Sequence, residues 1–241
     1  MTIKPLLYEN VEPVDKKRHS NLYVKTGVNY AFAKNVNAVP LMIKEFSQAF
    51  TEYPIVFAGN NSKVTPIVVM GFNEKQNLFI ANDASWNASY VPAFIRRYPF
   101  LLAKNNDGKT LTLCIDENFD GCNEEGRGER LYDSEGKRTQ YLEKTLQFLE
   151  ACQIHHLQTQ KFCEHLIELE LLEPMQVQFN GKTEEETRIL SRFMGVNLKK
   201  LIGITEKNIL KLFRNDGLEL IYQHIFSIRN FDSMTNAMRQ Y

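Results

Sequence analysis

The stretch 90–102 is aromatic, contains two prolines and includes two adjacent arginines: Tyr90-Val91-Pro92-Ala93-Phe94-Ile95-Arg96-Arg97-Tyr98-Pro99-Phe100-Leu101-Leu102. A shorter relative precedes it in the chain, Phe50-Thr51-Glu52-Tyr53-Pro54-Ile55-Val56-Phe57. Both contain Tyr-Pro followed by an apolar run. Because the residue before a proline is disfavoured in the helical region, we predict that each passage is a helical segment that ends at the tyrosine and continues as a buried strand.

Composition is typical of a globular protein. The 241 residues are 43% hydrophobic, and 29 Lys and Arg residues balance 29 Asp and Glu residues. No overall field therefore favours nucleic acid or an anionic membrane, and no run of about eighteen apolar residues predicts a membrane span. We predict one domain over residues 1–241, with residues 1–137 mostly β with short helices and residues 138–241 mostly helical with one β-hairpin.

Cysteine usage bears on the cellular compartment. Cys114, Cys122, Cys152 and Cys163 show no C-x-x-C spacing, and no charged segment with an apolar region behind it follows Met1. These features favour reduced cysteines and a cytoplasmic protein.

The first half contains several strand signals. Residues 54–58, 66–72, 78–81, 100–103 and 111–115 are apolar runs separated by turn-forming linkers, which favour antiparallel hairpins. Asp107-Gly108 is a tight-turn signal between the last two. Weak alternation predicts a strand at 29–33, and Pro40 fits the first turn of a short helix.

The second half begins with a long helical pattern. Residues 140–171 contain neither glycine nor proline and repeat apolar residues on one face. They predict a long amphipathic helix, or two nearly collinear ones, closed by Pro174. Two further helices at 205–214 and 217–238 end the chain.

Residues 175–195 are read as a hairpin around Asn180-Gly181. The segment 183–195 is ambiguous, because Thr183-Glu184-Glu185-Glu186 is a capping box that indicates a helix start. The alternation of Ile189, Ser191 and Phe193 instead indicates a returning strand, which we favour. The expected fold is α+β: an antiparallel-rich sheet from the first half and residues 175–195, covered by the long helix and the two C-terminal helices.

Two patterns resemble metal sites. Asp116-Glu117-Asn118-Phe119-Asp120-Gly121 matches the start of a calcium loop, but Arg127 occupies the twelfth place, where a bidentate glutamate belongs. We interpret it as an acidic solvated loop. Cys152 and His156 are four residues apart on the long helix, and we interpret them as a core cysteine and a hydrogen-bonded histidine. We therefore predict no metal.

Known catalytic and cofactor motifs are absent from the sequence. There is no G-x-S-x-G, no H-E-x-x-H, no G-x-G-x-x-G and no phosphate-cradling loop. A triad, which is defined by geometry, stays open. No catalytic residue and no cofactor is predicted.

The two adjacent arginines are the most unusual feature of the apolar stretch. Because arginine is rarely buried unpaired, one of them is expected to reach a carboxylate or a ligand by a bidentate fork. We predict a ligand site of Trp86, Tyr90, Arg96, Arg97 and Tyr98. The alternative is an internal ion pair with Asp116 or Asp83, the aromatic residues being plain core.

Several segments together resemble the SapC family of Gram-negative bacteria. They are Pro5-Leu6-Leu7-Tyr8-Glu9-Asn10-Val11, Glu52-Tyr53-Pro54-Ile55-Val56-Phe57, Tyr90 to Phe100 as quoted above, Gly217-Leu218-Glu219-Leu220-Ile221-Tyr222-Gln223-His224, and Leu131-Tyr132-Asp133 followed by Glu135-Gly136. The family takes its name from a locus associated with S-layer protein, and some members carry a peptidase label. Members are often encoded beside outer-membrane receptors and halogenase-like flavoproteins. The resemblance transfers no catalytic residue to a position in this chain.

Two functional hypotheses follow. The favoured one is a non-catalytic cytoplasmic binding or accessory protein whose aromatic–arginine pocket takes a protein or peptide partner. The alternative, which the family label implies, is a peptidase-like hydrolase with an unrecognised active site. A homodimer formed through the closing helices is a third hypothesis.

Overall fold

The computed structural model describes residues 7–27, 29–60, 62–105, 108, 110–179 and 188–240, without the side chains of 178–179, 188–192 and 237–240. Several residues used above lie outside the described part: Pro5, Leu6, Asn106, Asp107, Asn180, Gly181 and the capping box at 183–186.

The chain divides into two compact units. Unit 1 comprises Met1–Lys34, Ile80–Trp86 and Ala93–Ile154, and unit 2 comprises Asn35–Phe79, Asn87–Pro92 and His155–Tyr241. The long helix α3 (Gln140–Glu168) contributes residues to both. A single domain over the whole chain stays a prediction.

Unit 1 contains two small antiparallel sheets. The first has the order β1-β7-β6 and the second β8-β2-β9. Their strands are β1 (Val11–Pro13), β2 (Tyr23–Val24), β6 (Phe100–Lys104), β7 (Leu111–Asp116), β8 (Cys122–Asn123) and β9 (Glu129–Arg130). The short helices are η1 (Ala31–Ala33) and α2 (Ala93–Arg96).

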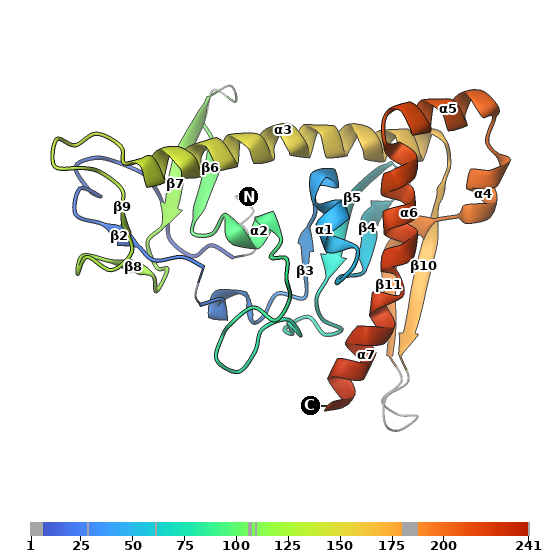
Figure 1. Cartoon of the computed structure of the whole chain (residues 1–241), viewed down its shortest axis with the longest axis horizontal. Helices are drawn as coiled ribbons and strands as arrows, with labels where there is room; N and C mark the ends of the chain where they lie inside the picture. The colour runs from blue at the N-terminus through green and yellow to red at the C-terminus, as the bar shows by residue number, and fades with distance from the viewer. Residues whose placement is uncertain are drawn as a thin grey trace. The chain divides into compact units, whose positions relative to one another are not determined.

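Unit 2 is built on an antiparallel sheet of order β10-β11-β4-β5-β3 (Figure 1). The strands are β3 (Ala38–Pro40), β4 (Ile55–Asn60), β5 (Lys63–Val69), β10 (Leu172–Phe179) and β11 (Arg188–Val196). The helices are η2 (Ile43–Glu45), α1 (Phe46–Ala49), α4 (Leu198–Gly203), α5 (Glu206–Arg214), α6 (Gly217–Ser227) and α7 (Asn230–Gln240).

The predicted α+β class is confirmed, with a long helix and C-terminal helices beside antiparallel sheets. Both Tyr-Pro passages behave as expected, because α1 leads through buried Tyr53 into β4, and α2 leads through buried Tyr98 into β6. The strands differ from the prediction in being shared among three sheets. Residues 188–196 form the returning strand that the alternation favours.

Three predictions in the first half are wrong, each for a local reason. Residues 31–33 form a 3₁₀ helix, because the side chain of Asn29 accepts a hydrogen bond from the amide of Ala31 (2.8 Å) and starts a turn. Pro40 ends the edge strand β3, a position that tolerates a missing donor. Residues 78–81 contribute a single bridge, Ile80 to Trp86.

The second half shows two differences. Helix α3 ends in a Schellman motif, in which Leu171 N–H donates to Leu166 O and Glu170 has a φ of 52°, so that Pro174 lies inside β10 instead of closing the helix. The helix predicted at 217–238 is divided into α6 and α7, and α4 precedes α5. Within the described residues, no helix has the length and hydrophobicity that a membrane crossing needs.

The core of unit 2 is organised around β4. Ile55, Val56 and Phe57 are completely buried, because both faces of this strand are covered. Val56 packs in a cluster with Phe193 and with residues of α7, whereas the ring of Phe57 lies 5.1 Å from the ring of His224 on α6. This two-sided burial accounts for the uninterrupted apolar run after Tyr53-Pro54.

Side chains of α6 complete the backbone hydrogen bonds of β4 at Ile55. His224 Nδ1–H donates to Ile55 O (2.7 Å), and Ser227 Oγ accepts from Ile55 N–H (2.9 Å). The other ring nitrogen, Nε2, accepts from Val196 N–H (3.0 Å). Both nitrogens of the neutral ring are therefore occupied, and burial lowers the pKa of His224 to about 4.

This histidine predicts a pH-dependent stability. Between pH 6.5 and about 4 the unfolded chain binds a proton at His224 that the folded chain does not, so acidification favours unfolding. We expect this residue to contribute a loss on the order of 3 kcal/mol over that interval. Urea unfolding followed by circular dichroism at successive pH values measures it. His224→Gln should flatten the slope in this interval, and an unchanged slope would contradict the assignment.

Candidate functional site: an aromatic cavity in unit 1

A buried carboxylate anchors the site. Asp116, at the end of β7, is completely buried. Its Oδ2 accepts from Glu9 N–H (2.7 Å) and from the hydroxyl of Tyr98 (3.2 Å), and its Oδ1 accepts from the amides of Asn10 (3.0 Å) and Asn118 (3.1 Å). A buried charge requires such donors. The carboxylate thereby holds the N-terminal segment, the end of β7 and the ring of Tyr98 in one arrangement.

Aromatic rings extend outward from Tyr98. Phe32 stacks on it at 4.4 Å between ring centroids, and Tyr8 and Phe119 each contact it edge-on at 5.2 Å. Tyr30 continues the row, 6.1 Å from Phe32. Edge-to-face and offset contacts at these separations are the favoured arrangements of aromatic pairs.

Two neighbouring cavities share a wall made of Phe32, Tyr98 and Phe119. The larger has a volume of about 510 Å³, within the usual range of ligand pockets, and its charged lining residues are Lys25, Glu9 and Asp120. The smaller, of about 220 Å³, is lined in addition by Arg96. The shared wall makes one aromatic-lined hollow, in which Arg96 lines the smaller cavity and Lys25, Glu9 and Asp120 line the larger one.

Arg96 is the arginine that lines a cavity. Its side chain is exposed, and its guanidinium carbon lies 5.2 Å from the centre of the Phe148 ring on α3. Burial raises the pKa of the nearby Tyr30, and the guanidinium of Arg96 opposes that rise. Tyr30 and Arg96 therefore form the polar side of the smaller cavity.

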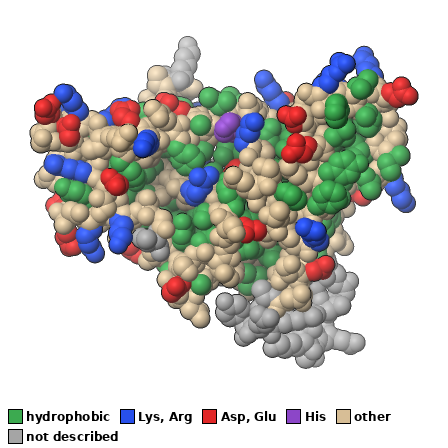
Figure 2. Space-filling view, in the orientation of Figure 1, with side chains coloured by type: hydrophobic (Ala, Val, Ile, Leu, Met, Phe, Trp, Pro, Cys, Tyr) green, Lys and Arg blue, Asp and Glu red, His purple; other side chains and the backbone are tan. Residues whose placement is uncertain are grey.

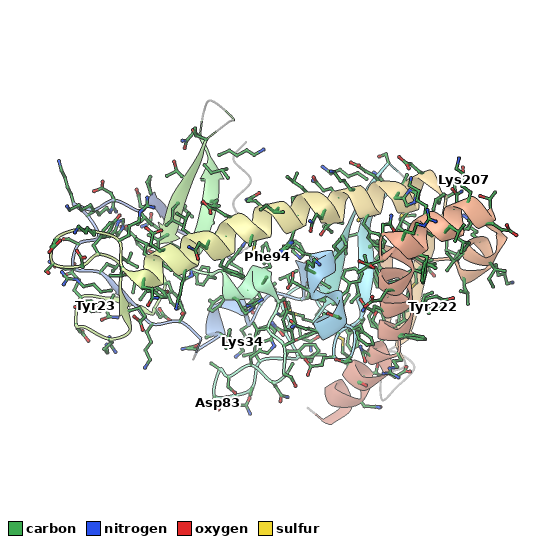
Figure 3. All side chains as sticks on the ribbon, turned by 45° about the horizontal axis from the view of Figure 1, so that its top comes forward. Tyr23, Lys34, Asp83, Phe94, Lys207 and Tyr222 are labelled. Atoms are coloured by element: carbon green, nitrogen blue, oxygen red, sulfur yellow. The ribbon has the colours of Figure 1, made fainter. Side chains whose placement is uncertain are left out.

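Arg97 has a different environment. Its guanidinium carbon lies 4.1 Å above the ring of Phe94, which is labelled on α2 in Figure 3. It also neighbours the hydroxyl of Tyr8; burial raises the pKa of Tyr8 to about 12, and the guanidinium opposes that rise. Its Nε is buried with no hydrogen-bond partner among the residues described. Arg97 therefore packs against Phe94 and Tyr8, and it does not line either cavity.

The alternative ion pairs do not form. In the described part of the chain, Asp116 is satisfied by the four donors above, and Asp83 accepts hydrogen bonds from the amide and hydroxyl of Ser85 (3.0 and 2.6 Å). Neither carboxylate pairs with an arginine there. The expected internal salt bridge is therefore replaced by hydrogen bonds to backbone and hydroxyl groups.

The two remaining predicted residues fall in different units. Trp86 lies in unit 1, with its ring 5.4 Å from that of Tyr30. Tyr90 lies in unit 2, where its hydroxyl donates to Glu45 Oε1 (2.7 Å) and its amide donates to Glu52 Oε2 (3.0 Å). Trp86 and Tyr98 thus belong to one aromatic row, Arg96 lines the smaller cavity beside Tyr30, and Tyr90 has its own polar partners.

Sequence reasoning missed Tyr30, Phe32 and Phe119 as cavity walls. The first two were assigned to a strand, and Phe119 was assigned to a solvated acidic loop. A large aromatic residue inside an otherwise acidic loop is itself a sign of burial, since the loop gains by removing it from water. That signal was available for Phe119, which is 8% exposed.

The first aspartate of the calcium-like loop, Asp116, is buried and accepts hydrogen bonds from the protein itself. Within the described ranges, no group of three or more His, Cys, Asp or Glu side chains is arranged to hold a metal ion. His156, paired above with Cys152, has its Nε2 3.1 Å from the amide of Gln160.

A family model described as SapC matches residues 14–234. The chain belongs to the SapC family. The match includes Arg96, Tyr98 and Asp116, and it leaves out Leu7 and Glu9 among the residues that line the two cavities of this SapC chain. No curated protein and no solved structure matches it.

The peptidase label carried by some SapC proteins calls for an activated nucleophile or a set of metal ligands. Burial instead raises the pKa of the Cys122 and Cys163 thiols to about 12 and raises that of Cys114. The buried His19 is held between the amide of Asp15 and the carboxylate of Glu117 (3.0 Å each). These groups are arranged for structure, and the hydrolase stays a prediction of the label.

Asp116→Ala should destabilise the protein. It removes the acceptor of the partly buried amides of Glu9 and Asn10 and of the buried Tyr98 hydroxyl, and we expect a loss on the order of 3 kcal/mol in the free energy of unfolding. Urea unfolding measures it. The matched control is Asp120→Ala in the same loop, an exposed carboxylate whose removal should change stability by about 0.5 kcal/mol or less. Equal effects of the two substitutions would contradict the anchoring role.

Substitutions of the two adjacent arginines should have different effects on the melting temperature. Arg97→Ala removes a close cation–π contact and a neighbour of the Tyr8 hydroxyl, which should lower Tm by about 3–6 °C. Arg96→Ala alters an exposed side chain and should change Tm by about 1 °C. The reverse order would exchange the roles assigned to the two residues.

Proposed function

We propose that this SapC-family chain is a non-catalytic cytoplasmic binding or accessory protein whose aromatic cavity takes a ligand with an apolar body and a carboxylate. The observation that carries the proposal is the shared wall of Phe32, Tyr98 and Phe119 between two cavities, with Arg96 lining one of them.

The wall fits the apolar part of such a ligand. Tyr98 is 6% exposed and Phe119 is 8% exposed, and the hydroxyl of Tyr98 is already bound to Asp116. The exposed ring carbons, and not the hydroxyl, are therefore what the cavity offers at this wall, and aromatic carbon surface packs against rings and aliphatic side chains. Because Asp116 fixes Tyr98, the wall is preorganised, which reduces the entropic cost of binding.

The cationic groups fit the polar part. Arg96 lines the smaller cavity beside Tyr30, and Lys25 lines the larger one. A guanidinium matches a carboxylate in a bidentate, charge-assisted arrangement. Because Glu9 and Asp120 accompany Lys25 in the larger cavity, the carboxylate is assigned to Arg96 in the smaller one. A peptide segment that presents a carboxylate next to an aromatic or aliphatic side chain has both features.

Trp86 offers a direct measurement, because it is the sole tryptophan of the chain and its ring contacts Tyr30. Titration with N-acetyl-L-phenylalanine should change its fluorescence in a saturable way, whereas the amide N-acetyl-L-phenylalaninamide should bind more weakly. Arg96→Gln should weaken binding of the carboxylate by about tenfold or more and bring it close to that of the amide.

The matched control is Arg127→Gln, since Arg127 is exposed and pairs with Glu125 away from the cavities. It should bind like the unaltered protein. Equal affinity for the acid and the amide, or equal effects of the two substitutions, would contradict a carboxylate site at Arg96.

A further inference from the structure

The helices α4, α5 and α6 of unit 2 expose large apolar side chains. Ile202 is 76% exposed and Phe213 is 68% exposed. Figure 2 shows hydrophobic side chains gathered over this part of the molecule, and Figure 3 labels Tyr222 on α6 and Lys207 at α5. We define the apolar surface as Leu198, Ile202, Leu210, Phe213, Tyr222 and Phe226, all at least 43% exposed.

Each of the first two helices has a buried side and an exposed apolar side. On α4, Leu201 is 3% exposed while Leu198 and Ile202 lie within about 40° of each other around the axis, at about 100° per residue. On α5, Leu212 is fully buried while Phe213 and Leu210 lie within about 60°. The exposed leucines, isoleucine and phenylalanine are therefore additional to the packing of unit 2.

Cations follow the exposed apolar side in the same rotational order on both helices. On α4 the next position around the axis is Lys199, and on α5 the next arc of about 60° contains Arg214, Lys207 and Lys211. The helices α4 to α6, residues 198–227, contain five Lys or Arg residues and three acidic residues, Glu206, Asp216 and Glu219. Glu206, in the first turn of α5, lies between Phe213 and Leu210 around the helix axis. The chain as a whole has no net charge, but this part of it has a net positive charge beside an apolar surface.

This charge restricts the occupant of the surface. A second copy would bring together two surfaces in which five cations outnumber three acidic residues, which opposes self-association. Four of the five cations are lysine, the cation that is depleted at protein–protein interfaces. An anionic bilayer surface, by contrast, attracts lysine and arginine alike through their charge and accommodates leucine, isoleucine and phenylalanine below its headgroups.

We propose that the apolar surface of α4–α6 docks on a membrane that contains anionic phospholipids. Leu198, Ile202, Leu210 and Phe213 enter the headgroup–acyl boundary, and Lys199, Lys207, Lys211 and Arg214 lie at the level of the phosphates. The docking is peripheral, and it uses a surface separate from the aromatic cavity of unit 1.

Vesicle co-sedimentation of the full chain tests the proposal. The purified protein should sediment with vesicles of phosphatidylglycerol and phosphatidylcholine in equal parts and stay in the supernatant with pure phosphatidylcholine. Raising the salt from about 0.1 M to about 1 M should release it, because screening shortens the reach of the cations. Lys207→Glu with Lys211→Glu, and separately Leu210→Ser with Phe213→Ser, should each weaken binding by about tenfold or more.

Matched controls alter exposed residues elsewhere. Lys34→Glu with Lys63→Glu makes the same charge change, and Ile154→Ser with Leu157→Ser removes two apolar side chains of α3 that are 57% and 59% exposed. Both controls should bind anionic vesicles like the unaltered protein. Circular dichroism verifies that every variant is folded.

Three results would overturn the proposal. One is no binding to the anionic vesicles, which would leave a protein partner as the occupant. Another is equal binding to both kinds of vesicle. The last is a dimer, seen by light scattering, that Leu210→Ser with Phe213→Ser dissociates, because a second copy would then occupy the surface.

Discussion

The carboxylate of Asp116 is the constraint on which the described arrangement of unit 1 depends. A charge removed from water has to be matched by donors, and here those donors come from residues 9, 10, 98 and 118. Satisfying one side chain therefore fixes the N-terminal segment, the end of β7 and the ring of Tyr98 together. The aromatic wall of the cavities follows, since Phe32 and Phe119 both pack on Tyr98.

In unit 2, too, buried polar groups find hydrogen-bond partners on other elements. Strand β11 pairs with β4 at Ala58 and Phe57, and at Ile55 the backbone groups of β4 are satisfied by His224 and Ser227 instead. Asn230 continues this role by donating to the carbonyl oxygens of Phe50 and Tyr53 (2.8 and 3.0 Å). Helices α6 and α7 are therefore held against this part of the chain by side-chain hydrogen bonds as well as by apolar packing.

Much of the fold could be predicted because its signals are local and periodic. The two Tyr-Pro transitions, the long helix and the hairpins follow from proline sterics and from helical or alternating periodicity. The errors at residues 29–33 and at Pro174 arise from side-chain and C-cap hydrogen bonds that periodicity does not register. At the candidate site, Arg96 and Tyr98 were within reach of sequence reasoning, whereas Tyr30 and Phe32 join them only through tertiary contacts.

The buried cysteines give the protein a chemical property of its own. Thiol–disulfide exchange and oxidation proceed through the thiolate, and the thiols of Cys114, Cys122 and Cys163 are kept protonated by burial. At neutral pH these three sulfurs are therefore poor nucleophiles as long as the chain is folded. While the chain is folded, these three thiols accordingly react slowly with disulfides and oxidants, mainly because of burial.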